Sequence, residues 1–455
     1  MAAENNLLCC NKVHFIGAGG VSVNALAKYA ALSGKTVSAS DKRLTEEAEE
    51  LKKFGVKIFL GHHAVSVREK DLVVYTSAAG SDNPELKEAA RLGIKAVCRA
   101  EYLGAITAGF KTSIAVAGCH GKTTVTAMIA DISIAAGSDP TVFLGGYSYD
   151  YGNFRNGGKN VVIAEACEYK KSFLKIAHNV SVVLNVDNDH KDSYESDKDL
   201  EDSFLKFAGD TLAVVNADDA RCADVFNKTT VTFGVKNAAN YEARRIARNK
   251  CGGYSFTLYA YGEKVGRINL SVTGRYNVFN ALAAAAVAAE LGVKFGVIKT
   301  ALENFKGVKR RNENIGVIGR AECVADYAHH PTEIKAAVAA LGGKSENTLV
   351  VFQPHTYSRT ENLLSEFVNV LLPIKNLVIL KTYAARENYS AKGSAKTLAA
   401  ELVKAGSDAI YVDNDAELFT VVKDKAAKTD KILFIGAGDV YEKAKTLVKN
   451  FNKTG

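Results

Sequence analysis

Apolar and polar positions alternate in a way that predicts repeated strand–turn–helix units. An apolar run at 13–16 leads into a glycine turn, and a helical spacing of apolar residues follows over 21–33. Further short apolar runs at 35–41 and 71–79 predict more strands. Strands that alternate with helices favour a parallel sheet of Rossmann type. We expect this first α/β region to end near residue 109.

The pattern restarts at 112–132, where the sequence "TSIAVAGCHGKTTVTAMIADI" predicts a strand, a glycine loop and a helix. Alternating polarity over 231–272 predicts antiparallel strands, and the alanine-rich run at 274–292 predicts a buried helix. Additional strands are expected at three apolar runs, namely 160–168, 180–187 and 211–217.

A third restart follows the sequence "GVKRRNENIG". Strand, loop and helix patterns then continue to the C-terminus, at 321–341, 348–360, 376–385 and 431–448. We therefore predict an α/β protein of three domains, 1–109, 110–312 and 313–455. The first and third are expected to be Rossmann-like, and the central one a mostly parallel sheet of P-loop type with a small antiparallel part.

The glycine loop of the central region carries the strongest chemical signal. Its residues are Gly118, Cys119, His120, Gly121, Lys122, Thr123 and Thr124. A loop between a strand and a helix N-terminus presents backbone N–H groups to phosphate oxygens. Lys122 would neutralise the terminal phosphates of ATP, and the Thr123 hydroxyl would bind Mg²⁺. Val116 replaces the first glycine of the longer P-loop pattern, so this is the shorter G-x-x-G-K-T-T form.

Acidic and histidine residues follow the next two predicted strands. Glu165 and Glu168 come after one strand, and Asp187, Asp189 and His190 come after the other. In open α/β sheets, ligands bind at the carboxyl ends of the strands. We expect Glu165 and His190 each to supply one ligand to a Mg²⁺ ion, which prefers few protein ligands together with phosphate and water.

Composition narrows the functional classes. The formal net charge of +8 is modest for 455 residues, and the lysines are scattered, which argues against nucleic-acid binding. The eight cysteines show no zinc-type spacing and suit a reducing cytosol. We see no signal peptide and no apolar run of membrane-spanning length, so a cytoplasmic protein that does not bind membranes is expected.

Eight motifs, in order, resemble those of the Mur ligase family: "GCHGKTT", "EACEYKKSFL", "NVDNDHKDSY", "GRYNVFNALAA", "GVKRR", "DYAHHPTEIKA", "FQPHTYSRT" and "GAGDV". The similarity covers nearly the whole chain. It implies an ATP- and Mg²⁺-dependent ligase of peptidoglycan precursor synthesis, which joins L-alanine to the carboxylate of UDP-N-acetylmuramate through an acyl phosphate. A monomer or homodimer is expected.

The resemblance also assigns residues to roles. Lys122, His190 and Arg310 are expected to be catalytic, and Thr123, Glu165 and His190 to bind the metal. Contacts with the nucleotide are assigned to the glycine loop and to Asn277, Asn280 and Asp326. Contacts with the UDP-substrate are assigned to Gly17, Gly19, Gly20, Asp41 and Ser77. Contacts with the amino acid are assigned to His329, His330, His355 and Arg359. The base that accepts the amine proton stays open between His190 and a histidine of the third domain.

Four residues depart from the family pattern and bear on substrate identity: Asn24, Tyr276, Asn312 and Thr356. Three alternatives therefore stay open. One is a related Mur-type ligase that adds a peptide or another amino acid. The second is a non-catalytic nucleotide-binding paralogue. The third is an NAD(P)-dependent oxidoreductase, since Asp41 lies at the distance from the first glycine loop expected of a ribose-binding acid.

Overall fold

The computed structural model describes residues 4–187, 193–225, 230–250, 252–385 and 387–454. It divides into two compact units. The first comprises Met1–Ser271 and Asn277–Lys306, and the second Val272–Tyr276 and Gly307–Gly455. No helix among the described residues is long and apolar enough to cross a membrane.

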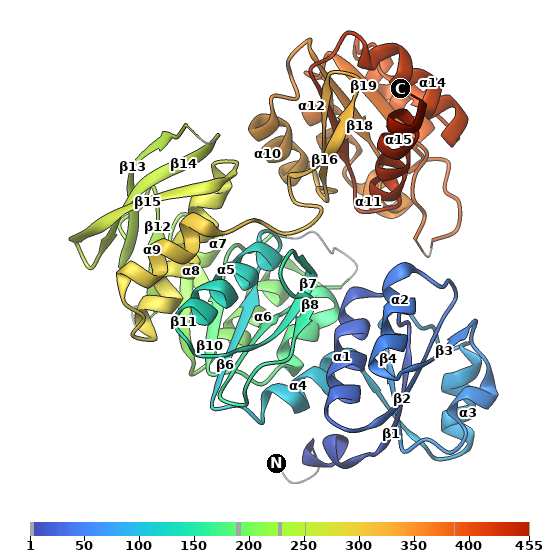
Figure 1. The fold of residues 1–455 in the computed structure, drawn as a ribbon, viewed down its shortest axis with the longest axis vertical. Coiled ribbons are helices and arrows are strands. Elements are labelled where there is room, and N and C mark those ends of the chain that lie inside the picture. Colours follow the sequence, from blue (N-terminus) through green and yellow to red (C-terminus); the bar gives the residue numbers. More distant parts are fainter. Residues whose placement is uncertain (1–3, 188–192, 226–229, 251, 386, 455) are drawn as a thin grey trace. The chain divides into compact units, whose positions relative to one another are not determined.

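The first sheet has five parallel strands in the order β3-β2-β1-β4-β5 (Figure 1). Its strands are β1 (Lys12–Ile16), β2 (Thr36–Asp41), β3 (Lys57–Leu60), β4 (Leu72–Tyr75) and β5 (Lys95–Cys98). The helices are η1 (Glu4–Cys9), α1 (Val21–Leu32), α2 (Glu46–Glu50), η2 (Leu51–Phe54), η3 (Ala64–Val67), α3 (Pro84–Arg91) and α4 (Arg99–Thr107). The inner strand β1 is buried from Val13 to Ile16, as expected of a strand covered on both faces. The predicted Rossmann-like region is thereby confirmed.

The second sheet has ten strands in the order β15-β14-β13-β12-β11-β10-β6-β9-β7-β8. They are β6 (Thr112–Ala117), β7 (Thr141–Ser148), β8 (Gly152–Arg155), β9 (Val161–Glu165), β10 (Val180–Val183), β11 (Leu212–Asn216), β12 (Val231–Gly234), β13 (Tyr241–Arg248), β14 (Gly253–Ala260) and β15 (Glu263–Thr273). The helices are α5 (Lys122–Ala135), η4 (Tyr169–Lys175), α6 (Asp197–Ala208), α7 (Ala220–Val225), α8 (Tyr276–Glu290) and α9 (Phe295–Asn304).

The antiparallel prediction for 231–272 is partly wrong. β13 and β14 do form an antiparallel pair. However, β12 pairs in parallel with both β11 and β13, so it extends the parallel sheet instead of starting a separate one. Alternation of polarity reports one exposed face, which is typical of antiparallel sheets but also occurs in parallel strands near the edge of a sheet, so it does not fix strand direction.

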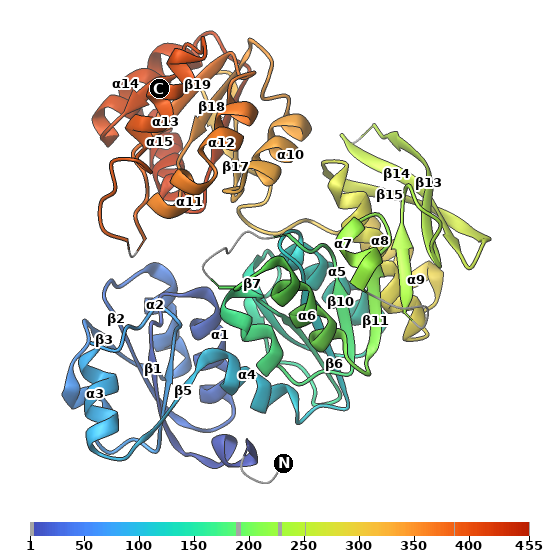
Figure 2. The ribbon, with the colours of Figure 1, turned by 180° about the vertical axis from the view of Figure 1, so that it is seen from behind.

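The second unit contains a six-stranded sheet in the order β16-β17-β21-β18-β19-β20 (Figure 2). Its strands are β16 (Glu313–Ile318), β17 (Ala321–Asp326), β18 (Thr348–Phe352), β19 (Asn376–Leu380), β20 (Ile410–Val412) and β21 (Lys431–Ile435). The helices are α10 (Pro331–Leu341), α11 (Tyr357–Asn362), α12 (Leu364–Leu371), α13 (Ala395–Lys404), α14 (Asp415–Ala426) and α15 (Val440–Thr454). Only β16 pairs antiparallel among the strands with a described register, and separate apolar clusters cover the two faces of the sheet.

The first two sheets share a continuous hydrophobic core. One cluster runs from Phe15 and Tyr102 in the first α/β region to Phe143 and Phe173 in the central one. Helix α1 packs against both β7 and β8 (Figure 1). This shared core explains why the two regions form one compact unit, although each has a sheet of its own.

Candidate active site

The phosphate-type loop lies at the carboxyl ends of three adjacent parallel strands. β6 lies between β9 and β10, and the loop follows β6 directly. Gly118 has φ +130°, and a Cβ there would lie 3.0 Å from the Leu184 Cβ. Gly121 has φ +87° and is the N-cap of α5. Both positions therefore require glycine, which explains the two fixed glycines of the motif.

Lys122 is held inside the loop by carbonyls and a carboxylate. Its Nζ donates to the Gly118 carbonyl at 2.5 Å and to the Cys119 carbonyl at 3.2 Å. It also pairs with Glu168, whose two oxygens lie 2.9 and 3.2 Å away. Burial opposes the charged form, but the nearby Glu168 carboxylate outweighs it and holds the pKa of Lys122 above its usual value. Lys122 is therefore a protonated cation placed at the loop.

Thr123 and Glu165 form an oxygen-rich pair beside Lys122. The Thr123 hydroxyl donates to Glu165 Oε2 at 2.8 Å, and the same oxygen accepts from the Gly145 amide at 2.9 Å. A side chain at position 145 would collide with the Glu165 carboxylate, so the glycine in β7 makes room for it. Hard oxygen donors in such a pair fit Mg²⁺. The third predicted metal ligand, His190, lies outside the described residues.

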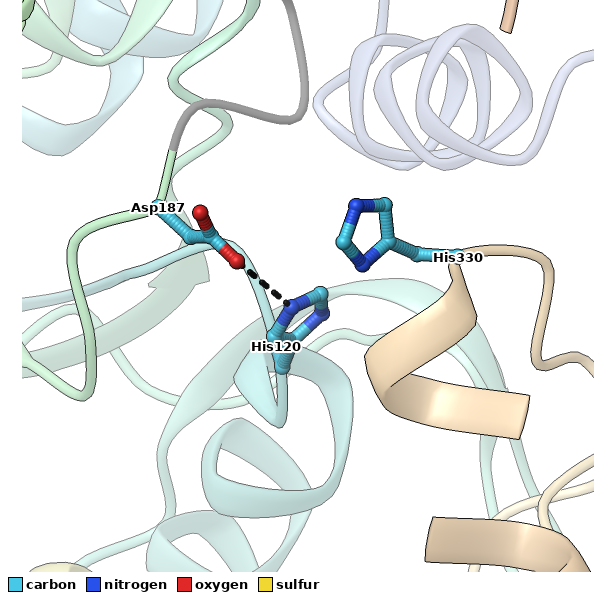
Figure 3. Close-up of side chains that lie close together, drawn as sticks. All are labelled: His120, Asp187 and His330. Atoms are coloured by element: carbon cyan, nitrogen blue, oxygen red, sulfur yellow. Dashed lines mark ion pairs between the residues drawn. The ribbon is translucent and has the colours of Figure 1, made fainter. Parts of the chain in front are cut away.

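The loop is braced by the segment that follows β10. The His120 amide donates to Asn185 Oδ1 at 2.9 Å, and Asn185 Nδ2 donates back to the His120 carbonyl at 3.0 Å. The Cys119 thiol donates to the Asp187 carbonyl at 2.7 Å. Figure 3 shows the His120 ring facing the Asp187 carboxylate, with Nε2 and Oδ2 3.8 Å apart. The loop is thus fixed from a neighbouring strand end before any ligand enters.

The two asparagines assigned to the nucleotide lie on α8. Asn280 faces the loop closely enough that a Cβ on Gly121 would approach its Oδ1 to 2.7 Å. Its Nδ2 donates to Asn277 Oδ1 at 2.9 Å. The structure therefore brings the α8 asparagines and the glycine loop together.

The first glycine loop, Gly17–Gly20, lies at the carboxyl end of β1. The amides of Gly17 and Ala18 donate to the Ser40 carbonyl at 2.8 and 3.1 Å. The Gly19 amide donates to Asp41 Oδ2 at 2.8 Å. Ser77 follows the neighbouring strand β4, so it lies at the same edge of the sheet. Four of the five residues assigned to the UDP-substrate thus belong to this loop or contact it directly.

Within the second unit, three of the residues assigned to the amino acid come together. The His329 and His355 rings lie 5.9 Å apart, and Arg359 Nη1 lies 3.4 Å from His355 Nδ1. His330 is the N-cap of α10, and its Nδ1 accepts from the Thr332 amide at 3.4 Å. These residues come from the loop before α10 and the segment at α11, which follow β17 and β18, the two strands on either side of β21.

Arg310 and Asp326 are tied into the second unit by several contacts. The Arg310 guanidinium stacks on the Tyr327 and Tyr441 rings, at 4.9 Å from each, and donates to the Gly438 carbonyl at 2.8 Å. The buried Asp326 accepts from the Asn312 amide at 2.9 Å and the Ala328 amide at 2.8 Å. Burial raises the pKa of Asp326.

The chain matches three family models along its length. They are the Mur ligase family catalytic domain over 12–111, the Mur ligase middle domain over 116–288 and the Mur ligase glutamate ligase domain over 310–438. It is 39% identical to the UDP-N-acetylmuramate–L-alanine ligase of Clostridium beijerinckii, covering 94% of this chain and 95% of the relative. The corresponding ligase of Aquifex aeolicus is also 39% identical, over 97% of this chain and 98% of its own.

The chain belongs to the Mur ligase family.

A solved structure supports the same placement. The crystal structure of a UDP-N-acetylmuramate-alanine ligase from Thermotoga maritima matches with a TM-score of 0.85 at 29% identity, over 98% of this chain and 100% of that one. A murein peptide ligase from Psychrobacter arcticus shares the fold, with a TM-score of 0.75 at 21% identity. The predicted three-domain α/β architecture of the Mur ligases is confirmed. Membership of this family decides against the oxidoreductase.

Three of the four departures from the Mur ligase pattern have structural explanations. Tyr276 and Asn312 are partners, since Asn312 Nδ2 donates to the Tyr276 hydroxyl. Asn24 is fully buried and donates to backbone carbonyls of Glu47 and Ala18. Thr356 adopts φ +66°, a strained value for a β-branched residue, at the start of α11. Strain of this kind concentrates at functional sites.

Three residues of the candidate site were given no role by sequence reasoning. Glu168 neutralises Lys122, Asn185 braces the loop, and Arg99 Nη1 donates to Ser22 Oγ at 3.2 Å beside the first glycine loop. The E-x-x-E spacing after β9 marked Glu168 as acidic and close to the loop. The sequence gives no comparable signal for Asn185 or Arg99, because their partners lie 65 and 77 residues away.

Proposed function

We propose that this protein is an ATP-dependent ligase that joins L-alanine to the carboxylate of UDP-N-acetylmuramate in peptidoglycan precursor synthesis. The observation that carries the proposal is the protonated Lys122 held at a glycine loop, next to the Thr123–Glu165 oxygen pair. A carboxylate resists attack by an amine, because attack adds negative charge to an anion. Phosphorylation to an acyl phosphate supplies a leaving group and requires cations that bring two anions together.

Each residue group has a role in this proposal. Lys122 and the glycine loop Gly118–Thr124 bind the triphosphate, and Asn277 and Asn280 contact the nucleotide from α8. Thr123, Glu165 and His190 hold Mg²⁺, which would neutralise phosphate charge when bound. Arg310 is assigned a catalytic role, and Asp326 is assigned a contact with the nucleotide. The first glycine loop, Asp41 and Ser77 bind the UDP part of the substrate.

The amino acid is assigned to His329, His355 and Arg359, which lie close together, and to His330 at the N-cap of α10. The Arg359 guanidinium provides a positive charge for a carboxylate, and its contact with His355 orients it. The three domains of the proposal are 1–109, 110–312 and 313–455, one for each substrate. We place the protein in the cytoplasm, where ATP and UDP-sugars are made, as a monomer or homodimer.

The test is phosphate release from ATP in the presence of UDP-N-acetylmuramate, with L-alanine, L-serine, glycine or the tripeptide as the amine. L-alanine should give the highest kcat/KM. Faster release with the tripeptide would favour a peptide-adding Mur ligase instead. No amine-dependent release with any of the four would contradict the ligase and favour a nucleotide-binding paralogue without activity.

A further inference from the structure

A connected polar network lies between α1 of the first α/β region and β8 of the central one. Asn153 Nδ2 donates to the Val21 carbonyl at 2.8 Å and to Asn24 Oδ1 at 3.0 Å. Asn153 Oδ1 accepts from Lys28 Nζ at 3.0 Å, and Lys28 also pairs with Glu50 at 2.9 Å. Asn24 Nδ2 completes the network with the Glu47 carbonyl at 2.8 Å. We call these three side chains, Asn24, Lys28 and Asn153, the α1–β8 clamp.

The side chains of the α1–β8 clamp are buried, and aromatic rings pack near them in the sequence. Asn24 and Asn153 are 0% exposed and Lys28 is 5% exposed. The rings of Tyr29, Phe143 and Phe154 pack with centroids 5.2 to 6.2 Å apart. Apolar packing alone tolerates small sliding of one element on another, whereas a buried polar network is satisfied in only one arrangement. The clamp therefore fixes the register between α1 and β8.

The clamp is also joined to the first glycine loop. Val21 is the first residue of α1, directly after Gly20, and its carbonyl accepts from Asn153. Asn24 Nδ2 lies 3.4 Å from the carbonyl of Ala18, inside the loop. The loop that binds the UDP part in the proposed function is thus anchored to a strand of the sheet that carries the phosphate loop. Asn153 lies 0% exposed at the centre of this connection.

We propose that Asn153, with Asn24 and Lys28, positions the UDP-sugar substrate relative to ATP by locking the first glycine loop onto the central sheet. The inference rests on the proposed function. The reacting carboxylate is held by one sheet and the triphosphate by the other, so their approach depends on the register between the sheets. A displacement of about 1 Å of reacting groups can cost on the order of a hundredfold in rate. Asn153 is a positioning residue and does not touch either substrate.

The test compares Asn153→Ala and the milder Asn24→Ser with the parent enzyme. Turnover of the parent with ATP, UDP-N-acetylmuramate and L-alanine is measured first. An inactive parent would contradict the proposed function, whereas the clamp is tested only by comparing the variants with an active parent. Each variant is then assayed for kcat, and its Kd for UDP-N-acetylmuramate and for a non-hydrolysable ATP analogue is measured by calorimetry. Asn24→Ser keeps a small polar group and serves if Asn153→Ala does not fold.

Lys175→Ala is the matched control. Lys175 of η4 pairs with Glu101 of α4 at 2.7 Å, so it joins the same two α/β regions, but through exposed side chains outside the α1–β8 clamp. Exposed ion pairs of this kind contribute little to the stability of the folded protein. Its kcat should stay within twofold of the parent.

The expected result is a fall in kcat of about tenfold or more in the clamp variants, with both Kd values within threefold of the parent. If the clamp had only a structural role, the variants would yield less folded protein, but the folded fraction would not show a lowered kcat together with unchanged Kd values. A fall in kcat of less than threefold would overturn the proposal. A loss confined to the Kd or KM of the UDP-sugar, with kcat retained, would overturn it as well.

Discussion

The two glycine loops of this protein have the same order of strand, loop and helix, but different charged residues lie beside them. Each follows an inner strand of a parallel sheet and opens a helix, at Gly17–Gly20 before α1 and at Gly118–Gly121 before α5. In the first loop, three amides are bound by the neighbouring strand end, through the Ser40 carbonyl and the Asp41 carboxylate. In the second, a lysine at the helix start is paired with Glu168.

The difference lies in the sign of the charge that each loop places at its ligand edge. An aspartate beside the first loop suits the hydroxyl groups of a sugar, while a protonated lysine inside the second suits a triphosphate. A glycine loop after a strand therefore indicates a ligand edge. The charged residue beside it indicates which ligand.

The largest effect is expected at Lys122. Lys122→Ala should lower ATP-dependent ligation by at least about a hundredfold, because the triphosphate loses its fixed cation. Binding of UDP-N-acetylmuramate should stay close to that of the parent. The measurement is phosphate release together with calorimetry for the UDP-sugar, and Lys159→Ala, at an exposed position before β9, is the control. Unimpaired turnover in Lys122→Ala would contradict the assignment of the second loop, through Lys122, to the triphosphate.

The next effect concerns the metal at the second loop. Glu165→Gln should raise the Mg²⁺ concentration needed for half-maximal activity by about tenfold or more, since a charged oxygen ligand becomes neutral. A Mg²⁺ titration of ligase activity at saturating ATP measures this. Glu195→Gln, an exposed glutamate, should titrate like the parent. Coincident curves for Glu165→Gln and the parent would count against Glu165 as a ligand.

A smaller effect is expected at the first loop, and it should concern the UDP-sugar instead of ATP. Asp41→Ala should raise the KM for UDP-N-acetylmuramate by roughly tenfold, because a charged partner of the loop is lost. The KM for ATP should not change. Steady-state kinetics with each substrate varied in turn separates the two loops. Equal increases in both KM values would show that Asp41 has no special relation to the UDP-sugar.

The smallest effect concerns the two helices that follow the loops, each of which carries a charged side chain that is at least partly removed from water. In α1, Lys28 pairs with Glu50. In α5, burial, aided by Asp150, raises the pKa of Asp131 from 3.8 to about 6, although Lys306 opposes this. Ionised Asp131 therefore costs stability above about pH 6, and this cost disappears as the pH falls below about 4.

Asp131→Asn should therefore be more stable than the parent at pH 8, by about 3 kcal/mol at most, given that one pKa unit corresponds to about 1.4 kcal/mol. The gain should vanish at pH 4. Urea unfolding at both pH values measures it, and ligase activity should be retained. A gain that persists unchanged at pH 4 would show that ionisation of Asp131 is not its cause.

Much of the fold followed from patterns that local physics imposes. Buried parallel strands read as apolar runs, so β1, β6, β10 and β21 were recognisable at once. The short strands β3, β5 and β8 were not, because each has four residues and partly exposed positions. The direction of β12 was also predicted wrongly, since a strand with one partly exposed face shows alternating polarity whichever way its partners run.

Local sequence was enough to identify the chemistry that is encoded within a few residues, namely the two glycine loops, Lys122, Thr123 and the acidic residues at the end of β9. Glycine conformations, helix N-termini and side-chain charge act over that short range. Three pairings became visible only in the folded protein: Glu168 neutralises Lys122, Tyr276 and Asn312 are partners, and Asn24 belongs to a clamp with Asn153. These pairs are 36 to 129 residues apart, and contacts at such separations depend on how whole elements pack, which no local pattern records.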